Sequence, residues 1–164
     1  MNERAKILLL ILLLLTLVAT VTQRDRIQEI IARFTSRGLR NNNPGNIRKS
    51  GDAWLGLAAE QTDDAFFVFE HPVYGIRAMA RIFKNYQTRH GLDSIAAIIS
   101  RWAPPSENDT EAYIKSVVRR TGLDAEQVIN VESNLAAILP AVITHENGVN
   151  PYSDELIVAG IAAA

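Results

Sequence analysis

The sequence predicts a mostly α-helical domain with one small β element, preceded by one N-terminal transmembrane helix. Three observations carry this prediction. Residues 7–21 form an uncharged apolar run. Residues 65–69, AFFVF, have the β-branched and aromatic composition of a strand. After Pro72, apolar residues recur at helical spacing toward the end of the chain. The length of 164 residues suits one domain, at residues 37–164, behind the anchor.

Residues 1–22 are expected to be a membrane anchor. The apolar run ILLLILLLLTLVATV follows Arg4 and Lys6 and holds 15 residues, somewhat fewer than the roughly 20 that cross a bilayer. This length also suits a signal peptide, but no A-x-A cleavage pattern follows it. We therefore expect an uncleaved helix that contacts a membrane through residues 7–22. A cleaved signal peptide and a buried core helix are the alternatives.

Residues 23–36 are expected to join the anchor to the domain as an amphipathic helix, because apolar side chains recur there at helical spacing. The next segment, SRGLRNNNPGNIRKSGDAW, is rich in Asn, Gly and Pro, which favour turns over regular structure. Beyond it, residues 65–69 are expected to pair with residues 54–57 as a small hairpin or sheet.

Three helices are expected between residues 72 and 122, each bounded by residues that cap or break a helix. Their limits are expected at His71-Pro72 and Gly91, at Asp93 and Pro104-Pro105, and at Asp109 or Thr110 and Gly122.

A short helix is expected at residues 124–129, followed by a longer one at residues 134–146 that Ser133 caps. Pro140 lies in the middle of this last segment. Because proline lacks the backbone N–H and its ring clashes with the preceding turn, Pro140 is expected to break or kink the helix, or to start a fresh one.

Glu146 is the candidate catalytic residue. The apolar stripe of the last helix reaches position 146 by a further step of four, so the carboxyl group points the way the core residues point. Apolar neighbours and the negative end of the helix dipole both disfavour a charged carboxylate there. A glutamate that holds its proton near neutral pH suits a glycosidic general acid. The alternative is a structural salt bridge, with Arg40 or Arg101 as partner.

The text around Glu146, AVITHENGVNPYS, resembles the catalytic segment of lytic transglycosylases and goose-type lysozymes. In that segment a helix ends in E-S-G-x-x-N-P and its glutamate is both acid and base. Asn147 stands where that pattern has serine and Gly148 fits it, whereas Asn150-Pro151 follows one position earlier than the N-P of the pattern. The resemblance implies that Glu146 is the acid and base of a glycan-cleaving enzyme.

A broader resemblance covers residues 37 to about 161. The stretches RGLRNNNPGNIR, WLGLAAEQTD, YGIRA, RWAPPSENDTEAYI and HENGVNPYSDELI are similar to those of small phage and prophage virion proteins. The expected fold of that family is lysozyme-like. The order of the segments also resembles flagellar-type glucosaminidases, but there the glutamate helix comes first. We therefore expect a circularly permuted lysozyme-like domain in which the last helix packs beside the asparagine turn.

Amides and a second acid are expected to complete the site. The amides in NNNPGN either cap the local backbone or bind N-acetyl and hydroxyl groups of a sugar. Asp63 is the first choice for a second catalytic carboxylate, over Glu60, Asp64 and Glu70, because acids flank the β element where lysozymes place theirs. Without a second carboxylate, a transglycosylase that uses the muramyl 6-hydroxyl is expected. The predicted substrate-binding residues are Asn41, Asn42, Asn43, Asn46, Asn150 and Tyr152.

Tyr113, Trp102 and His145 are expected to have structural positions. Tyr113 and Trp102 lie on apolar faces and are expected in the core, with substrate positioning as the alternative for Tyr113. His145 precedes Glu146, and neighbouring residues do not share a helix face, so an exposed position is expected. The candidates for the mouth of the cleft are Ser106, Glu107 and Asn108, which follow the Pro-Pro turn.

Composition excludes several other functions. The chain has no cysteine, which excludes thiol nucleophiles, disulfides and cysteine-bound zinc. The three histidines lack paired metal-ligand spacing, so no metal or cofactor is expected. A net charge of −1 argues against a nucleic-acid partner.

The sequence therefore predicts a phage enzyme that cleaves the β-1,4 bond between N-acetylmuramic acid and N-acetylglucosamine in peptidoglycan during entry or lysis. It would be a muramidase or a lytic transglycosylase, tethered to a virion membrane or a host inner membrane with its domain facing the cell wall. Its partners would be glycan strands, the membrane and other virion proteins. The alternative is a non-catalytic virion structural or wall-binding protein with the same fold.

Overall fold

The computed structural model describes residues 23, 26–27, 30 and 36–164. The predicted anchor at residues 1–22 and most of the predicted linker therefore lie outside the described residues. The four described linker positions are helical and exposed, and Ile27 and Ile30 leave about half of their surface open. Within the part of the chain that can be described, no helix has the length and hydropathy needed to cross a membrane.

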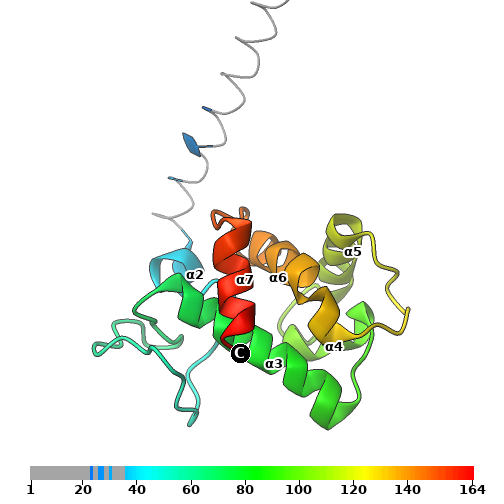
Figure 1. The fold of residues 1–164 in the computed structure, drawn as a ribbon, viewed down its shortest axis with the longest axis horizontal. Helices are drawn as coiled ribbons and strands as arrows, with labels where there is room; N and C mark the ends of the chain where they lie inside the picture. The colour runs from blue at the N-terminus through cyan, green and yellow to red at the C-terminus, as the bar shows by residue number, and fades with distance from the viewer. Residues whose placement is uncertain (1–22, 24–25, 28–29, 31–35) are drawn as a thin grey trace, which may run out of the picture.

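Helices make up most of the described chain, and Figure 1 shows them grouped around one core, with long loops on one side. The longest, α3, crosses beneath α6 and α7, while α4 and α5 pack at the opposite end from the loops. The helices are α2 (Arg37–Arg40), α3 (Pro72–His90), α4 (Ile95–Trp102), α5 (Thr110–Thr121), α6 (Val131–Asn147) and α7 (Asp154–Ala162).

Helix α6 runs through the centre of the domain and contacts α2, α3, α5 and α7. Its apolar stripe of Leu135, Ile138, Leu139, Val142 and Ile143 is fully buried, as the sequence predicts. Burying aliphatic side chains of this size contributes about 1.5–3 kcal/mol each in transfer free energy. The core therefore fixes the rotation of α6, and with it the direction in which the last turn points.

Between α2 and α3 the chain forms two isolated antiparallel bridges, Arg48 with Phe66 and Leu57 with Phe69. The second bridge agrees with the predicted pairing of residues 54–57 with 65–69, but a regular hairpin does not form. Backbone bonds still join the segments, from Ala58 N–H to the Val68 carbonyl oxygen and from Glu70 N–H to that of Gly56. The Gln61 amide adds to them by donating to the carbonyl oxygens of Ala58 and Val68. The predicted strand is thus an extended segment that two flanking loops hold.

The helix limits agree with the predictions at most ends and differ at a few. His71, Asp109 and the glycines after α3, α5 and α6 act as expected. The N-cap of α4 is Ser94 rather than Asp93. The N-cap of α6 is Asn130 rather than Ser133, and the Asn130 side chain accepts a hydrogen bond from the Ser133 backbone N–H. Helix α6 therefore begins one turn earlier than predicted.

Three further expectations change. Pro140 neither ends nor restarts a helix, because α6 continues through it from Val131 to Asn147, so a kink is the expected outcome that remains. Residues 124–129 are not helical. Their backbone instead bonds to the start of α4: Ile129 N–H donates to Asp93, and Ala96 N–H donates to Ala125. Long-range backbone pairing thus overrides the local helical pattern. Residues 37–40, expected to be irregular, form the single turn of α2.

Candidate active site

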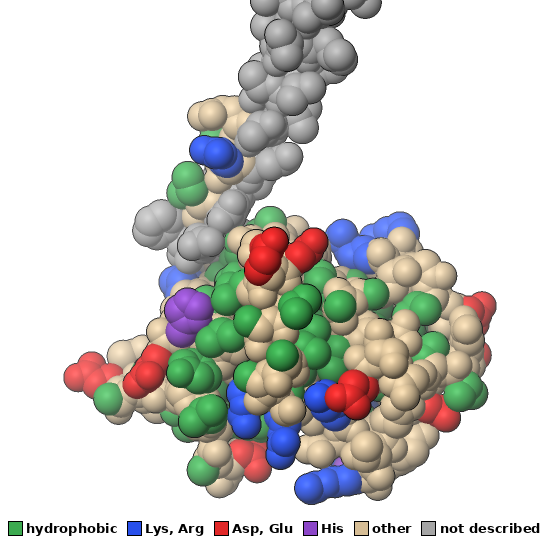
Figure 2. Space-filling view, viewed as in Figure 1, with side chains coloured by type: hydrophobic (Ala, Val, Ile, Leu, Met, Phe, Trp, Pro, Cys, Tyr) green, Lys and Arg blue, Asp and Glu red, His purple; other side chains and the backbone are tan. Residues whose placement is uncertain are grey.

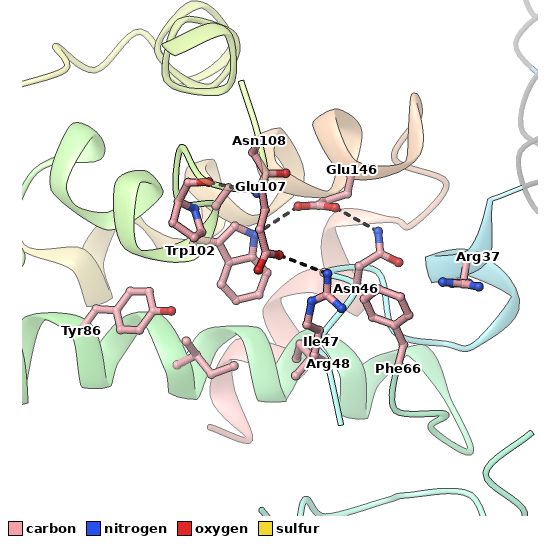
Figure 3. A pocket seen from close by; sticks show the side chains of 14 residues that line it. Arg37, Asn46, Ile47, Arg48, Phe66, Tyr86, Trp102, Glu107, Asn108 and Glu146 are labelled. Carbon is pink, nitrogen blue, oxygen red and sulfur yellow. Dashed lines mark hydrogen bonds and ion pairs between the residues drawn. The ribbon is translucent and has the colours of Figure 1, made fainter. Parts of the chain in front are cut away.

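The Glu146 carboxylate accepts hydrogen bonds from three side chains at the end of α6. Oε1 accepts from the Tyr113 hydroxyl at 2.7 Å and from the Trp102 indole N–H at 3.2 Å, and Oε2 accepts from the Asn46 amide at 2.9 Å. Figure 3 shows Trp102 and Asn46 on opposite sides of the carboxylate. The surroundings are therefore more polar than the apolar stripe predicts. The three donors are neutral, so the salt-bridge alternative describes none of these contacts.

Asn46 reaches Glu146 because the asparagine loop is pinned from both sides. The buried Asn43 side chain donates to the carbonyl oxygens of Ile47 and Phe67 and accepts from the Ile47 N–H. Asn46 itself has a φ of 48°, a left-handed conformation that Asn tolerates better than most residues. The loop also lies against α3 where only glycine fits, since a Cβ on Gly75 would stand 2.2 Å from the Asn42 carbonyl oxygen.

Asn147 ties the end of α6 to this loop. Its amide donates to the carbonyl oxygens of Pro44, at 2.8 Å, and Ile143, at 2.9 Å, and its Oδ1 accepts from the Ser36 hydroxyl. The side chain is buried. The expected position of the Glu146 helix, α6, beside the asparagine turn is therefore confirmed. Asn147 makes this connection, and it stands where the resembled catalytic segment has serine.

Trp102 and Tyr113 are held by aromatic contacts. The Trp102 ring packs edge-on against Phe83, with centroids 5.0 Å apart and an interplanar angle of 85°. The Tyr113 ring is buried and stacks on the exposed His145 ring, with centroids 3.6 Å apart. Helices α4 and α5 thus each hold one donor, Trp102 and Tyr113, against the Glu146 carboxyl group of α6.

The charge of Glu146 and the burial of its neighbours affect the titration of two groups. Burial, followed by the negative charge of Glu146, raises the pKa of Tyr113 above its ordinary value, so Tyr113 remains a proton donor at neutral pH. Partial burial lowers the pKa of His145, and the nearby Glu146 charge opposes this shift only in part. His145 is therefore uncharged at neutral pH, and its uncharged ring covers Tyr113.

Asp63 belongs to a separate cluster. Its carboxylate accepts from the Asn41 amide and the backbone N–H groups of Ala65 and Phe66, and it pairs with Arg37 at 3.2 Å. These contacts, led by the Asn41 hydrogen bond, lower the pKa of Asp63 from 3.8 to about 2. The pocket that Glu146 lines does not include Asp63. The predicted second carboxylate therefore acts here as a cap for the loop.

A pocket of about 860 Å³ opens beside Glu146, which is within the range of small-ligand sites. Of the three residues predicted at the cleft mouth, Glu107 and Asn108 line the pocket and Ser106 does not. Figure 3 shows Glu107 and Asn108 across from Asn46. The complete lining is Arg37, Gly45, Asn46, Ile47, Arg48, Phe66, Ile82, Tyr86, Trp102, Ala103, Pro104, Glu107, Asn108 and Glu146.

The other predicted substrate-binding residues have structural roles. Asn41 and Asn43 are buried, and Asn42 donates to the Phe69 carbonyl oxygen. Asn150 accepts from the Tyr152 backbone N–H, and the Tyr152 ring packs against the core. None of the five lines the pocket. Of the predicted amides, the structure brings Asn46 alone to the Glu146 pocket. Asn41 donates to the Asp63 carboxylate, and the others bond to backbone groups.

One phage protein is similar to this chain over most of its length. Protein P5 of Pseudoalteromonas phage PM2 is 47% identical over 128 residues, which cover 76% of this chain and 79% of that protein. This chain belongs to the Protein P5 family. The expectation of a phage protein is thereby supported. No family model matches the chain.

For this member of the Protein P5 family, the sequence identifies Glu146 and Asn46 but misses two of the three donors. Trp102 and Tyr113 are assigned to the core because each lies on an apolar helix face. Both assignments are half correct, since the rings pack inward while the polar tips meet Glu146. Within the described ranges, no three histidine, aspartate or glutamate side chains gather as a metal site.

Proposed function

We propose that this phage protein cleaves the β-1,4 bond between N-acetylmuramic acid and N-acetylglucosamine in peptidoglycan. In this proposal the domain is lysozyme-like and circularly permuted, and Glu146 is first the general acid and then the base. The observation that carries the proposal is the position of Glu146: a carboxyl at the end of a buried helix, held by three neutral donors, and open to a pocket of ligand size.

The proposed chemistry needs one proton and one carboxyl group. The Glu146 proton passes to the glycosidic oxygen, which leaves with the departing sugar as a hydroxyl group. The resulting carboxylate then takes the proton of the attacking hydroxyl, and the oxygen of that hydroxyl forms the new bond to C1. The carboxyl group is thereby restored. Asn46, Trp102 and Tyr113 hold both oxygens in place while the charge on Glu146 appears.

The contacts of Asp63 favour transglycosylation over hydrolysis within this proposal. A retaining or inverting hydrolase uses a second carboxylate about 5 to 9 Å from the acid. Asp63 is engaged by Arg37, Asn41 and the loop backbone. The other acid of the pocket lining is Glu107, which is paired with Arg48. A lone acid and base instead suits attack by the 6-hydroxyl of the muramyl residue, which gives an anhydro sugar.

Tethering to a membrane is part of the proposal. Residues 7–22 would anchor the chain in a virion membrane or a host inner membrane, with the domain facing the wall. Ser36, at the start of the continuously described chain, bonds to Asn147, the residue after Glu146. A tether that enters there would join the domain next to the end of α6 that carries Glu146.

The test is a clearing assay of the full-length chain, purified in mild detergent, on cell walls embedded in a gel. Glu146→Gln should lower clearing by about 10²–10⁴-fold, whereas Glu126→Gln, an exposed acid outside the pocket lining, should clear normally. Equal clearing by Glu146→Gln would overturn the assignment. If wild-type protein binds walls without clearing them, a non-catalytic wall-binding role replaces the proposal.

Mass spectrometry of the digested walls separates the two reactions. Transglycosylation should leave anhydro-muramyl ends, which are lighter by one water than hydrolysed ends. Reducing ends in wild-type digests would show that water attacks instead, and Glu107 would then be the next carboxylate to substitute.

A further inference from the structure

We propose that Arg37 and Arg48, which flank Phe66 in the pocket, bind a carboxylate carried by the substrate. This inference rests on the proposed function, because it assigns a charged group of the glycan strand to a part of the same pocket. It names a specificity subsite that the acid and base chemistry of Glu146 does not require.

Two guanidinium groups lie against one aromatic ring. The Arg37 and Arg48 carbons Cζ are 5.0 and 5.3 Å from the centroid of the Phe66 ring. In Figure 3 the Phe66 ring lies between the two arginines, beside Asn46. All three residues line the pocket. Stacking on an aromatic ring restricts a guanidinium group, so its N–H groups keep a defined direction.

Both arginines keep donors for a ligand. The described ion pairs use Nε of Arg37 with Asp63 and one Nη of Arg48 with Glu107. A guanidinium group has five N–H donors in a planar fork, which matches the two oxygens of a carboxylate. Both side chains leave more than half of their surface exposed. A carboxylate in the pocket can therefore meet either arginine without a change in the core.

Glu107 marks the place of the substrate carboxylate. Glu107 reaches Arg48 from the loop after α4. Its Oε2 atom is 3.1 Å from Nη2 of Arg48. Exposed pairs of this kind add little stability, since solvent screens them and both side chains lose freedom. A ligand carboxylate can therefore displace Glu107. Removing Glu107 should strengthen carboxylate binding, which is the reverse of what damage to the fold would do.

The subsite lies close to the proposed chemistry. Arg48 follows Asn46 by two positions, so their Cα atoms are at most about 7 Å apart, and Asn46 bonds directly to Glu146. A carboxylate held by Arg48 would thus lie on a sugar next to the reacting bond or on its substituent. Peptidoglycan offers two such sources: the lactyl group of a peptide-free muramyl residue, and the free carboxylates of a peptide stem.

Binding of three glycans to full-length Glu146→Gln protein, which does not cleave them under the proposed function, tests the inference. The ligands are a neutral chitooligosaccharide, peptide-free glycan strands with lactyl carboxylates, and glycan strands that carry stems. Each ligand is titrated into the Glu146→Gln parent and into three double variants. In these, Arg48→Gln, Glu107→Gln or Arg89→Gln is combined with Glu146→Gln. Arg89→Gln is the matched control, because Arg89 is exposed and outside the pocket lining.

Arg48→Gln should weaken binding of a carboxylate-bearing glycan about tenfold and leave the neutral ligand unchanged. Glu107→Gln should tighten the same glycan by about threefold, and Arg89→Gln should change nothing. A loss confined to stem-bearing strands assigns the carboxylate to the peptide, and a loss with peptide-free strands assigns it to the lactyl group.

Two results overturn the inference. If Arg48→Gln weakens binding of the neutral ligand equally, Arg48 shapes the pocket and does not recognise a carboxylate. If Arg48→Gln leaves binding of all three ligands unchanged, Arg48 contributes nothing to glycan binding. Both results leave the proposed function intact. Absence of binding by every glycan to every variant overturns the proposed function itself, and the subsite with it.

Discussion

Tyr113 is a single residue whose titration should be visible in protein stability. Its pKa is raised above the ordinary value of 10.0, first by burial and then by the Glu146 charge. The unfolded chain therefore loses this proton at a lower pH than the folded chain. The contribution of Tyr113 is complete below pH 10.0 and is lost progressively above it.

The corresponding variant is Tyr113→Phe, which keeps the ring and its stacking on His145 and removes the donor to Glu146. Urea unfolding near neutral pH should show a loss of about 1–3 kcal/mol. Above about pH 10 that difference should shrink, because only the wild type has a phenol at position 113 to ionise. A difference that stays constant to about pH 11 would contradict the assigned burial of the hydroxyl.

Asp63 provides the matching prediction in acid. Its pKa is lowered from 3.8 to about 2, chiefly by the Asn41 hydrogen bond. The stability it contributes is therefore present above pH 3.8 and is lost as the pH falls toward about 2. Asp63→Asn should melt below wild type at about pH 6, and the two melting temperatures should approach each other through that window. Parallel curves would show that the loop cap does not depend on charge.

At the scale of residues, the sequence identifies the side chain that matters but not its contacts. The step of four from Val142 places Glu146 on the buried side of its helix, because helical periodicity fixes direction. Periodicity cannot say what the polar tip of an apolar ring touches. Trp102 and Tyr113 therefore look like core residues until α4, α5 and α6 are packed together.

At the scale of the helix, two residues, Asn130 and Ser133, are candidates for the N-cap of α6. Asn130 accepts the Ser133 backbone N–H at 2.9 Å, so Asn130→Ala should lower the free energy of unfolding by about 1 kcal/mol. Ser133→Ala should leave it within about 0.5 kcal/mol of wild type. Thermal melts of the two variants decide the matter, and the opposite order would place the helix start where the sequence alone predicts it.

Most helix ends in this chain can be predicted because their signals are local. Pro72 at the first position of α3, Asp109 before α5 and the glycines after α3, α5 and α6 act within one turn of the backbone. Residues 124–129 are different, since their backbone partners lie near Asp93 and Ala96, some thirty positions earlier. A local pattern contains no information about such a partner.

At the scale of the whole molecule, Asn147 connects segments that lie 103 positions apart, through its hydrogen bond to Pro44. Asn147→Ser would restore the serine of the resembled catalytic segment, but the shorter side chain cannot make the same set of bonds. We expect a loss of about 1–3 kcal/mol and weaker wall clearing, because the loop that carries Asn46 is no longer held to α6. A stable, fully active Asn147→Ser protein would contradict this role.

The placement of α6 beside the asparagine loop could be anticipated only through resemblance to glycan-cleaving enzymes. No periodicity in the chain brings residue 46 to residue 146. The seat of the loop on α3 depends on Gly75, where a side chain would collide with the Asn42 carbonyl oxygen. Such long-range fits depend on the shapes of packed surfaces, which a single sequence does not display.

The indole of Trp102 gives the chain an intrinsic optical signal. Its N–H bonds to Glu146 and its ring forms part of the pocket wall, whereas the second tryptophan, Trp54, lies outside the pocket lining. Indole emission responds to nearby charge and to the entry or departure of water. A molecule that settles beside the carboxyl should therefore change the fluorescence of unlabelled protein, so occupancy can be followed in real time without a dye.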